Sequence, residues 1–444
     1  MSRFTARALI PSRVRHRIGP LLFSQAVFSR ACRALGPVLA GRLCAWFARP
    51  PARSGPGPTY LFIARDVAYK DIEQLRLHSR GTWISFSQSL LFQAQLAWLP
   101  SDFFAQLEFQ ERLRSDPTIR SEPSLRFALA LMCALRTRYG IDAVLSSNVD
   151  YAQDEFVRQA CRQLGIPFVV LLKEHVNTAY GERVWSEEYM RTGYRYEGDA
   201  VAVFGPRTRE ILIAHDVCAP DVIHVTGPPR FDAWATAPQP ATVDTVVLCA
   251  FSHPGQEGAA AFPEVLRAFV ALVPTRPDLV FVVKCRDHYE VDRVVGMLGE
   301  VVPHGLTVTH EVPMSSLLSR AVLVAGFGSL ALVEALYSPA EVVSIRFGGC
   351  TDDEDVQFDE RESEVARIVR FAHSAPGLGA MVRTVAAAPV HPEHDDRIAL
   401  LHRFFCAPQP SHSAALDVAL ESSVLGLSRR SPAPQATGAS ALKS

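Results

Sequence analysis

One glycine-rich loop combines the residue types that bind phosphate: Gly326, Phe327, Gly328 and Ser329. Small residues allow the backbone to approach an anion closely, and the free N–H groups at the start of a helix favour negative charge. Glu334 follows about one helical turn later, where its carboxylate can reach a ribose hydroxyl. The spacing favours a phosphate-binding loop. The simpler alternative is a tight strand–helix turn with Ser329 as the N-cap.

Two further places in the second half of the chain carry polar groups after apolar runs. Ser252 and His253 follow the run 246–250, and Lys284 ends the run 279–283. Ligands of doubly wound sheets bind beyond the carboxyl ends of the strands, so all three residues are candidates for contact with a diphosphate. The alternatives are a loop capped by His253 and a lysine that extends from the strand end into solvent.

Glu174 and His175 follow an apolar run in the first half of the chain, at residues 166–172. An acceptor hydroxyl needs a base within hydrogen-bond reach, and either side chain could take its proton. The alternative for His175 is a structural role in the loop.

Arg207 and Arg230 each follow a Gly-Pro sequence and are candidates for an anion clamp. Guanidinium groups bind carboxylates and phosphates through paired hydrogen bonds. The alternative is a structural salt bridge to Asp232 or Glu210.

Known metal and nucleophile motifs are missing from the sequence. There is no Walker A sequence, no H-E-x-x-H and no G-x-S-x-G, which argues against NTPases, zincins and the common serine hydrolases. Residues 351–355 contain an Asp-x-Asp spacing that could hold Mg²⁺, but the run of acidic residues favours a solvated acidic loop. We expect no metal site and no cofactor.

Short apolar runs alternate with amphipathic segments along most of the chain. Runs that are apolar throughout predict parallel strands covered on both faces. The expected strands are 59–64, 141–145, 166–172, 200–204, 222–225, 246–250, 279–283, 306–308, 322–325 and 342–345. Asp150 and Gly165 are expected to start and end a helix over residues 151–164. The pattern predicts an α/β protein with two Rossmann-like, doubly wound domains that face a central cleft.

Changes in composition divide the chain into five parts. We expect a basic N-terminal extension (1–58), a first Rossmann-like domain (59–232), a hinge (233–243), a second Rossmann-like domain (244–406) and a disordered tail (407–444). The tail is assigned from its Pro, Ser and Ala content.

The N-terminal extension is strongly basic. Residues 1–53 contain ten Arg and no Asp or Glu, although the whole chain has a net charge of -1. Arginines interleaved with apolar residues suit a peripheral contact with an anionic membrane surface, and the alternative is a locally packed or disordered segment. No run of 18 apolar residues is present. The nine scattered Cys favour a reducing, cytoplasmic location, and nothing indicates a nucleic-acid partner.

Four short motifs resemble one family of enzymes. They lie at residues 201–205, 225–232, 312–318 and 326–336. Together they are similar to bacterial glycosyltransferases of capsule and lipopolysaccharide biosynthesis of the GT-B type, and to CDP-glycerol glycerophosphotransferases. The likeness covers roughly residues 59–405 in order. Relatives often have Lys-x-His-Pro where this chain has Lys284 followed by Cys285, Arg286, Asp287 and His288, which argues against a catalytic role for that loop.

The resemblance implies a sugar transfer without bound metal, from a nucleotide-activated donor held by the second domain to a glycan or lipid-linked acceptor at the first. Three other functions remain open on the sequence: glycerol phosphate transfer from CDP-glycerol, epimerisation of a nucleotide sugar, and a non-catalytic two-lobed scaffold.

Overall fold

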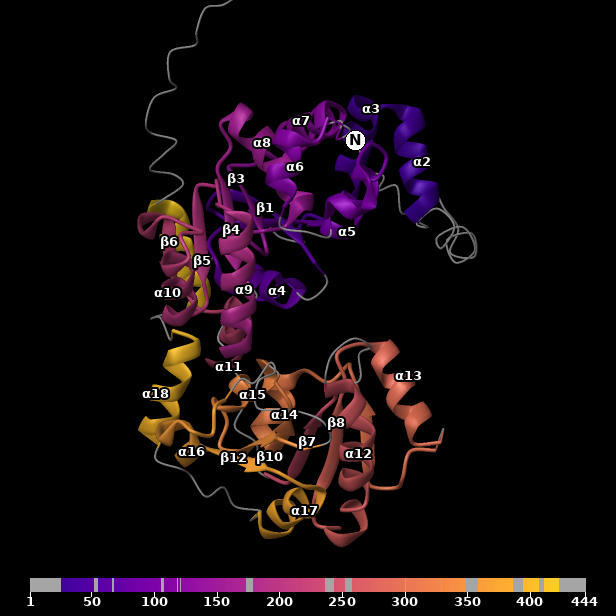
Figure 1. The fold of residues 1–444 in the computed structure, drawn as a ribbon, viewed down its shortest axis with the longest axis vertical. Helices are drawn as coiled ribbons and strands as arrows, with labels where there is room; N and C mark the ends of the chain where they lie inside the picture. Colours follow the sequence, from indigo (N-terminus) through magenta and orange to yellow (C-terminus); the bar gives the residue numbers. More distant parts are fainter. Residues whose placement is uncertain are drawn as a thin grey trace, which may run out of the picture.

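Two lobes, each built on one parallel sheet, make up the molecule (Figure 1). The computed structural model describes residues 25–51, 55–65, 68–104, 108–117, 119, 121–172, 179–235, 243–251, 258–299, 301–328, 330–347, 358–385, 394–406 and 411–422.

The sheet of the first lobe has the strand order β2-β1-β3-β4-β5-β6, with every pair parallel. The order reverses direction between β1 and β3, so this is the point where such a sheet binds ligands. The strands are β1 (Thr59–Ala64), β2 (Thr82–Ser87), β3 (Ala143–Ser146), β4 (Phe168–Leu172), β5 (Ala200–Val203) and β6 (Ile223–Val225). The helices are α4 (Tyr69–His78), α5 (Gln88–Gln95), α6 (Phe109–Ser115), α7 (Ser121–Tyr139), α8 (Glu155–Leu164), α9 (Ala179–Thr192) and α10 (Pro206–Ala214).

The sheet of the second lobe has the order β12-β11-β10-β7-β8-β9 and is also wholly parallel. Its direction reverses between β7 and β10. The strands are β7 (Thr245–Cys249), β8 (Val280–Lys284), β9 (Leu306–Thr309), β10 (Ala321–Gly326), β11 (Glu341–Ile345) and β12 (Val369–Ala372). The helices are α12 (Gly258–Val270), α13 (His288–Met297), α14 (Met314–Arg320), α15 (Leu330–Ala335), α16 (Ser363–Ile368) and α17 (Ala375–Thr384). The two doubly wound domains confirm the expected fold class.

The expected strands are confirmed to within about two residues. Except in the edge strands β6 and β9, their central residues are buried because helices cover both faces of each sheet. Two strands, β2 and β12, were not expected. The predicted helix 151–164 begins later than expected, at Glu155 after a 3₁₀ turn, with Asp154 at the N-cap position in place of Asp150. Gly165 ends it in the left-handed conformation, as expected, with φ 62°.

Part of the N-terminal extension is an integral layer of the first lobe. Helices α2 (Gln25–Leu35) and α3 (Pro37–Cys44) pack on it, and Gly41 lies so close to α7 that an added Cβ would meet Phe127 O at 2.5 Å. Further along, the backbone of Arg49 exchanges two hydrogen bonds with Ser85 of the edge strand β2. This pairing covers the open edge of the sheet. In the described residues, no helix has both the length and the apolar character to span a bilayer.

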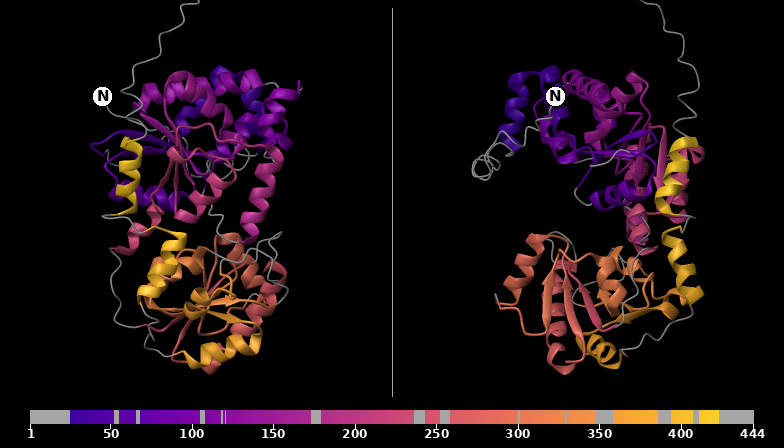
Figure 2. Two further views of the ribbon diagram at one scale, coloured as in Figure 1. Left: turned by 60° about the vertical axis from the view of Figure 1, so that its left-hand side comes forward. Right: turned by 180° about the vertical axis from the view of Figure 1, so that it is seen from behind.

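The chain returns to the first lobe at its C-terminal end. Helix α18 (His394–Phe404) runs along the second lobe, and α19 (His412–Leu420) lies beside the first (Figure 2). The carboxylate of Asp232 accepts hydrogen bonds from the backbone N–H groups of His412 and Ser413, both at 2.8 Å. A carboxylate at a helix N-terminus is stabilised by the helix dipole. The expectation of a disordered tail is therefore wrong for residues 411–422, where apolar Leu416 and Leu420 are buried.

Two glycines make room for this return. An added Cβ at Gly205 would lie 2.0 Å from Phe404 O, and one at Gly227 would lie 2.1 Å from His412 Nδ1 and 2.9 Å from Cys406 O. Gly227 also has φ 71°, a conformation that side chains with a Cβ rarely adopt. The C-terminal segment therefore packs directly against the Gly-Pro-Pro turn that begins at Gly227.

Phe231 joins the lobes by packing. Its ring lies 4.9 Å from the ring of Phe405 and 5.1 Å from that of Tyr337, which follows α15 of the second lobe. One hydrophobic core accordingly continues from the first lobe through Phe231 into the second. The remaining face of each sheet has a core of its own.

The close packing at Gly227 predicts a difference in stability between two glycine-to-alanine variants. Gly227→Ala and Gly165→Ala both place a Cβ on a residue of positive φ, which costs about 1 kcal/mol. Only Gly227→Ala also collides with neighbouring atoms, because nothing lies within 4 Å of a Cβ at Gly165. We expect Gly227→Ala to lose about 1–3 kcal/mol more than Gly165→Ala in urea denaturation. Equal losses would contradict the close approach of the C-terminal segment.

Candidate functional site

The carboxyl ends of the central strands of the second sheet form one continuous edge. Phe251 follows β7 and Phe327 follows β10, and their rings lie 5.6 Å apart. Both side chains are buried. The loops that begin at these residues are therefore neighbours at the point where the strand order reverses, as the sequence predicted.

Gly326 and Phe327 have structural reasons for their residue types. An added Cβ at Gly326 would lie 3.1 Å from Cys249 Cβ, so the glycine lets β10 approach β7 closely at this edge. Phe327 is 2% exposed and belongs to the core. Gly328 is half-buried at the end of the loop, and Ser329 lies outside the described residues.

Lys284 is the last residue of β8, which is the strand paired with β7. Its ammonium group donates to the carbonyl oxygens of His310 at 2.7 Å and Cys285 at 2.9 Å. Burial lowers the pKa of Lys284, and the nearby charge of Lys70 lowers it further. The side chain is therefore held at the strand end rather than extending freely into solvent. An anion bound beside it would oppose both effects.

Lys70 belongs to α4 of the first lobe, and the sequence analysis did not identify it. The side chain is exposed, and it interacts electrostatically with Lys284 and with Glu334 of the second lobe. The feature of the sequence that could have identified Lys70 is its position shortly after β1, at the carboxyl edge of the first sheet. Lys70 and Lys284 bring two positive charges together from opposite lobes.

Glu334 occupies α15, half-buried beside these lysines. Burial raises the pKa of Glu334, while Arg230, Lys70 and Lys284 oppose the rise and Asp71 adds to it. A carboxylate in this position can accept hydrogen bonds from a ligand hydroxyl. We refer to Lys70, Asp71, Arg230, Lys284 and Glu334 as the charged cluster. Its members come from both lobes, so the carboxyl edges of the two sheets face each other.

Arg230 is fixed within this cluster by Asp71. The Asp71 carboxylate is 1% exposed and accepts from Arg230 Nε at 2.9 Å, from the Arg230 backbone N–H at 3.0 Å, and from Nη2. The guanidinium also lies 5.9 Å from the ring of Phe204. The structural salt bridge considered for Arg230 therefore exists, but with Asp71 and not with Asp232. Arg207 pairs with Glu210 within α10 at 3.6 Å, as the alternative for that residue predicted.

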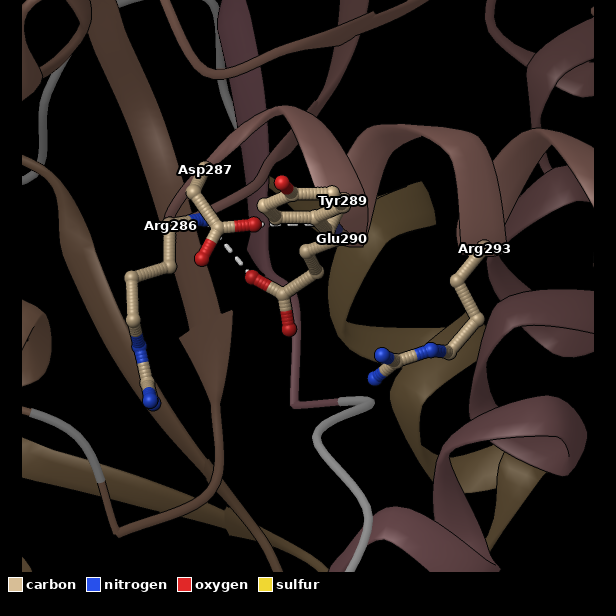
Figure 3. A pocket seen from close by; sticks show the side chains of 5 residues that line it. All are labelled: Arg286, Asp287, Tyr289, Glu290 and Arg293. Atoms are coloured by element: carbon tan, nitrogen blue, oxygen red, sulfur yellow. Dashed lines mark hydrogen bonds between the residues drawn. The ribbon is translucent and has the colours of Figure 1, made fainter. Parts of the chain in front are cut away.

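A pocket of about 230 Å³ lies beside the start of α13. Asp287 caps the helix by accepting from Glu290 N–H at 2.9 Å, and Glu290 accepts from Arg286 N–H at 2.6 Å. Arg286 and Arg293 extend on either side of the Glu290 carboxylate (Figure 3). His288 is the first residue of the helix, with its ring 3.8 Å from that of Tyr289. The sequence that replaces Lys-x-His-Pro thus forms a helix cap.

A buried polar cluster lies at the carboxyl end of β3, near the reversal point of the first sheet. Asp154 Oδ2 accepts a hydrogen bond from Ser146, and both side chains are buried. Burial raises the pKa of Asp154 to about 7, against the lowering effect of the hydrogen bond from Ser146. Within the described part of the chain, Asp154 Oδ1 and Ser147 Oγ have no hydrogen-bond partner. Asp154 can therefore hold a proton near neutral pH.

Several predicted site residues lie outside the described residues: Glu174, His175, Ser252 and His253, together with the acidic loop 351–355. Of the predicted donor residues, the structure brings Lys284 and Glu334 together. In the described residues, no group of three or more His, Cys, Asp or Glu side chains could hold a metal ion.

No protein-family model matches the chain, and no curated protein matches it in sequence. Solved structures do match its fold. A structure from Listeria monocytogenes, provisionally assigned as a UDP-N-acetylglucosamine 2-epimerase, superimposes with a TM-score of 0.52 at 14% identity, over 82% of this chain and 96% of that one. The UDP-GlcNAc 2-epimerase of Neisseria meningitidis bound to UDP-GlcNAc gives 0.46 at 14% identity, over 82% and 99%.

A trehalose-phosphate synthase (UDP-forming) from Burkholderia vietnamiensis gives a TM-score of 0.44 at 11% identity, over 83% of this chain and 100% of that one. At 14% identity, the likeness to the Listeria monocytogenes structure shows the fold alone. Together with the two parallel sheets, it confirms the expected GT-B-like pair of Rossmann-like domains.

Removing the charge of Asp71 should lower the free energy of unfolding. Asp71→Asn leaves the Arg230 guanidinium without its counter-ion, and breaking a buried pair in this way costs about 3–5 kcal/mol. The free energy of unfolding from urea titration measures the loss. Asp278→Asn is the matched control, because the Asp278 side chain is 53% exposed where it pairs with Arg276, and it should change stability far less. Similar effects of the two changes would contradict a structural role for the Asp71–Arg230 pair.

Asp154 should impose a pH dependence on stability. Its pKa of about 7 in the folded protein lies above the ordinary value of 3.8, so the folded state retains a proton that the unfolded state loses. Stability due to this group is full below about pH 4 and falls as the pH rises to about 7. Asp154→Asn should remove that slope, as measured by urea titrations between pH 4 and 8. A slope unchanged by the substitution would show that Asp154 is ionised when folded.

Proposed function

We propose that the protein is a glycosyltransferase that moves a sugar from a nucleotide-activated donor to an acceptor hydroxyl during synthesis of a surface polysaccharide or lipid-linked glycan. The observation that carries this proposal is the pair Lys70 and Lys284. Two ammonium groups from opposite lobes lie at the facing carboxyl edges, and Glu334 lies beside them. A diphosphate between them would neutralise charges that otherwise repel each other.

The donor lies against the second lobe in this proposal. Lys284 and Lys70 bind the diphosphate, and the loop that contains Gly328 and Ser329 adds backbone N–H groups. Ser252 and His253 contribute from the neighbouring loop, which follows Phe251. Glu334 accepts a hydrogen bond from a ribose hydroxyl. Fixed positive charge at the leaving group is the largest expected contribution to the rate, because negative charge develops there in the transition state.

The acceptor lies against the first lobe. Its hydroxyl oxygen forms a bond to the anomeric carbon, the bond from that carbon to the diphosphate oxygen breaks, and the nucleoside diphosphate leaves with the electron pair. The hydroxyl proton passes to Glu174 or His175, which follow β4 in the sequence. Such a base contributes about 10²–10⁴-fold to the rate.

The names of the structural neighbours support a nucleotide-sugar substrate, because the proteins with the same fold include an epimerase bound to UDP-GlcNAc and a UDP-forming synthase. They also support a second candidate, a nucleotide-sugar 2-epimerase, since the Listeria structure has that assignment. In the transfer of glycerol phosphate from CDP-glycerol, the charged cluster would likewise have to bind the diphosphate of the donor.

We place the enzyme at the cytoplasmic face of a membrane. The scattered free cysteines suit a reducing compartment. A lipid-linked acceptor would be reached from the membrane surface.

A pyrimidine nucleoside diphosphate should raise the melting temperature by several degrees. A ligand that binds only the folded state stabilises it by about 2.7 kcal/mol at 100 times its Kd. Lys284→Ala and Lys70→Ala should each remove most of the rise in a thermal-shift assay with UDP or CDP.

The matched control is Arg320→Ala, which removes a cation at the opposite, amino-terminal edge of the second sheet, where it pairs with Asp244. It should retain the full ligand response. If no nucleotide shifts the transition at millimolar concentration, or if all three variants respond like the wild type, the donor-site assignment is wrong.

Donor consumption with and without an acceptor separates the two candidate reactions. An epimerase converts its nucleotide sugar in the absence of any acceptor, whereas a glycosyltransferase requires one. A scaffold turns over no donor at all.

A further inference from the structure

Large exposed apolar side chains are concentrated in the first described segment of the chain. Trp46 is 67% exposed, and its exposed apolar neighbours are Val27, Leu35, Leu39, Leu43 and Phe47. We refer to these six side chains as the N-terminal apolar face. Elsewhere in the described residues, exposed large apolar side chains are scattered over both lobes, as is usual for a protein surface.

The helical geometry gathers these side chains into a stripe. Leu39 and Leu43 are one turn apart on the same side of α3. Helix α2 is a separate helix, because the chain turns at Gly36 with φ 74° before α3 begins. The rings of Phe28 on α2 and of Phe47 in the 3₁₀ turn Ala45–Phe47 lie 6.4 Å apart, which brings α2 against the end of this segment. The opposite side is anchored in the first lobe, where Ala40 and Cys44 are buried. The stripe is therefore rigid as well as exposed.

The surroundings of the stripe are positively charged. Arg30, Arg33 and Arg42 are exposed on the same helices, and no acidic residue occurs before Asp66. Arg138 of α7 lies 4.7 Å from the centre of the Trp46 ring, which adds another cation next to the most exposed apolar side chain. Five more arginines precede the described residues, between Arg3 and Arg17.

We propose that the N-terminal apolar face docks on an anionic lipid bilayer. Leu39, Leu43, Trp46 and Phe47 would enter the boundary between headgroups and acyl chains, while the arginines bind lipid phosphates. Aromatic and basic side chains on one face of a short helical segment favour this location. A second copy of the chain is a poorer occupant, because pairing the face with itself would bring arginines together with no acidic residue to oppose them.

The location of this face suits a lipid-linked acceptor, and in that respect alone the inference rests on the proposed function. Helices α2 and α3 lie on the first lobe, at the side away from the second lobe (Figures 1 and 2). Docking through this face would hold the acceptor lobe on the membrane and leave the donor lobe in solution.

Co-sedimentation of the full-length protein with vesicles tests the proposal. We expect binding to phosphatidylcholine vesicles that contain phosphatidylglycerol, and little binding to phosphatidylcholine alone. Leu43→Gln combined with Trp46→Ser should weaken binding to the anionic vesicles at least about tenfold, because two buried apolar side chains are lost. Leu77→Gln is the matched control: Leu77 is 72% exposed on α4, outside the face, and its loss should leave binding unchanged.

A second measurement does not depend on a disruptive change. Brominated lipid should quench part of the tryptophan fluorescence of the wild type, and Trp46→Phe, which keeps an aromatic side chain, should bind equally but lose that quenching. Equal sedimentation of the double variant and the wild type would overturn the proposal. So would a double variant that changes oligomeric state in light scattering, because the face would then be a protein interface. The nucleotide-induced thermal shift, measured on the same variants, reports separately on the proposed function.

Discussion

The buried ion pair between Asp71 and Arg230 is the constraint on which the rest of the structure depends. Asp71 lies at the start of α4, at the carboxyl edge of the first sheet, and Arg230 lies in the segment that leaves the first lobe. Their hydrogen bonds fix that segment, and the next two residues then make the junction: Phe231 packs on Tyr337 and Phe405, and Asp232 caps α19. Three consecutive side chains thus join the first lobe, the second lobe and the C-terminal helix.

This junction explains how ligand-binding groups from distant parts of the sequence meet. Because α4 is held against Arg230, the charge of Lys70, the residue before Asp71, interacts with Lys284 and Glu334 of the second lobe. The same charges that stabilise the junction therefore border the proposed donor site. Like charges brought together in this way have a cost without a ligand, and that cost favours binding of an anion. The charged cluster therefore has a structural role at the junction and a proposed role in ligand binding.

The fold could be predicted from the sequence far better than the site. Consecutive apolar residues reveal central strands such as β1 and β10, because both faces of a parallel sheet are covered. The strands that escaped prediction, β2 and β12, lie at sheet edges and interrupt their apolar residues with Ser85, Ser87 or Arg370. Lys284 and Glu334 could be identified because each follows a predicted strand. The pairing of Arg230 with Asp71 could not, since 159 residues separate the partners and only the fold brings them together. Likewise, the contact of Asp232 with the first N–H groups of α19 could not be predicted, since about 180 residues separate the partners, although Ser411 supplies an N-cap within the segment itself.

A crystal structure with a bound nucleoside diphosphate is the most direct test of a donor site shared by the two lobes. We expect the diphosphate to lie between Lys70 and Lys284, with the ribose against Glu334 and both lobes in contact with the ligand. A nucleotide bound instead in the pocket between Arg286 and Arg293, or held by one lobe with Lys70 turned away, would contradict it.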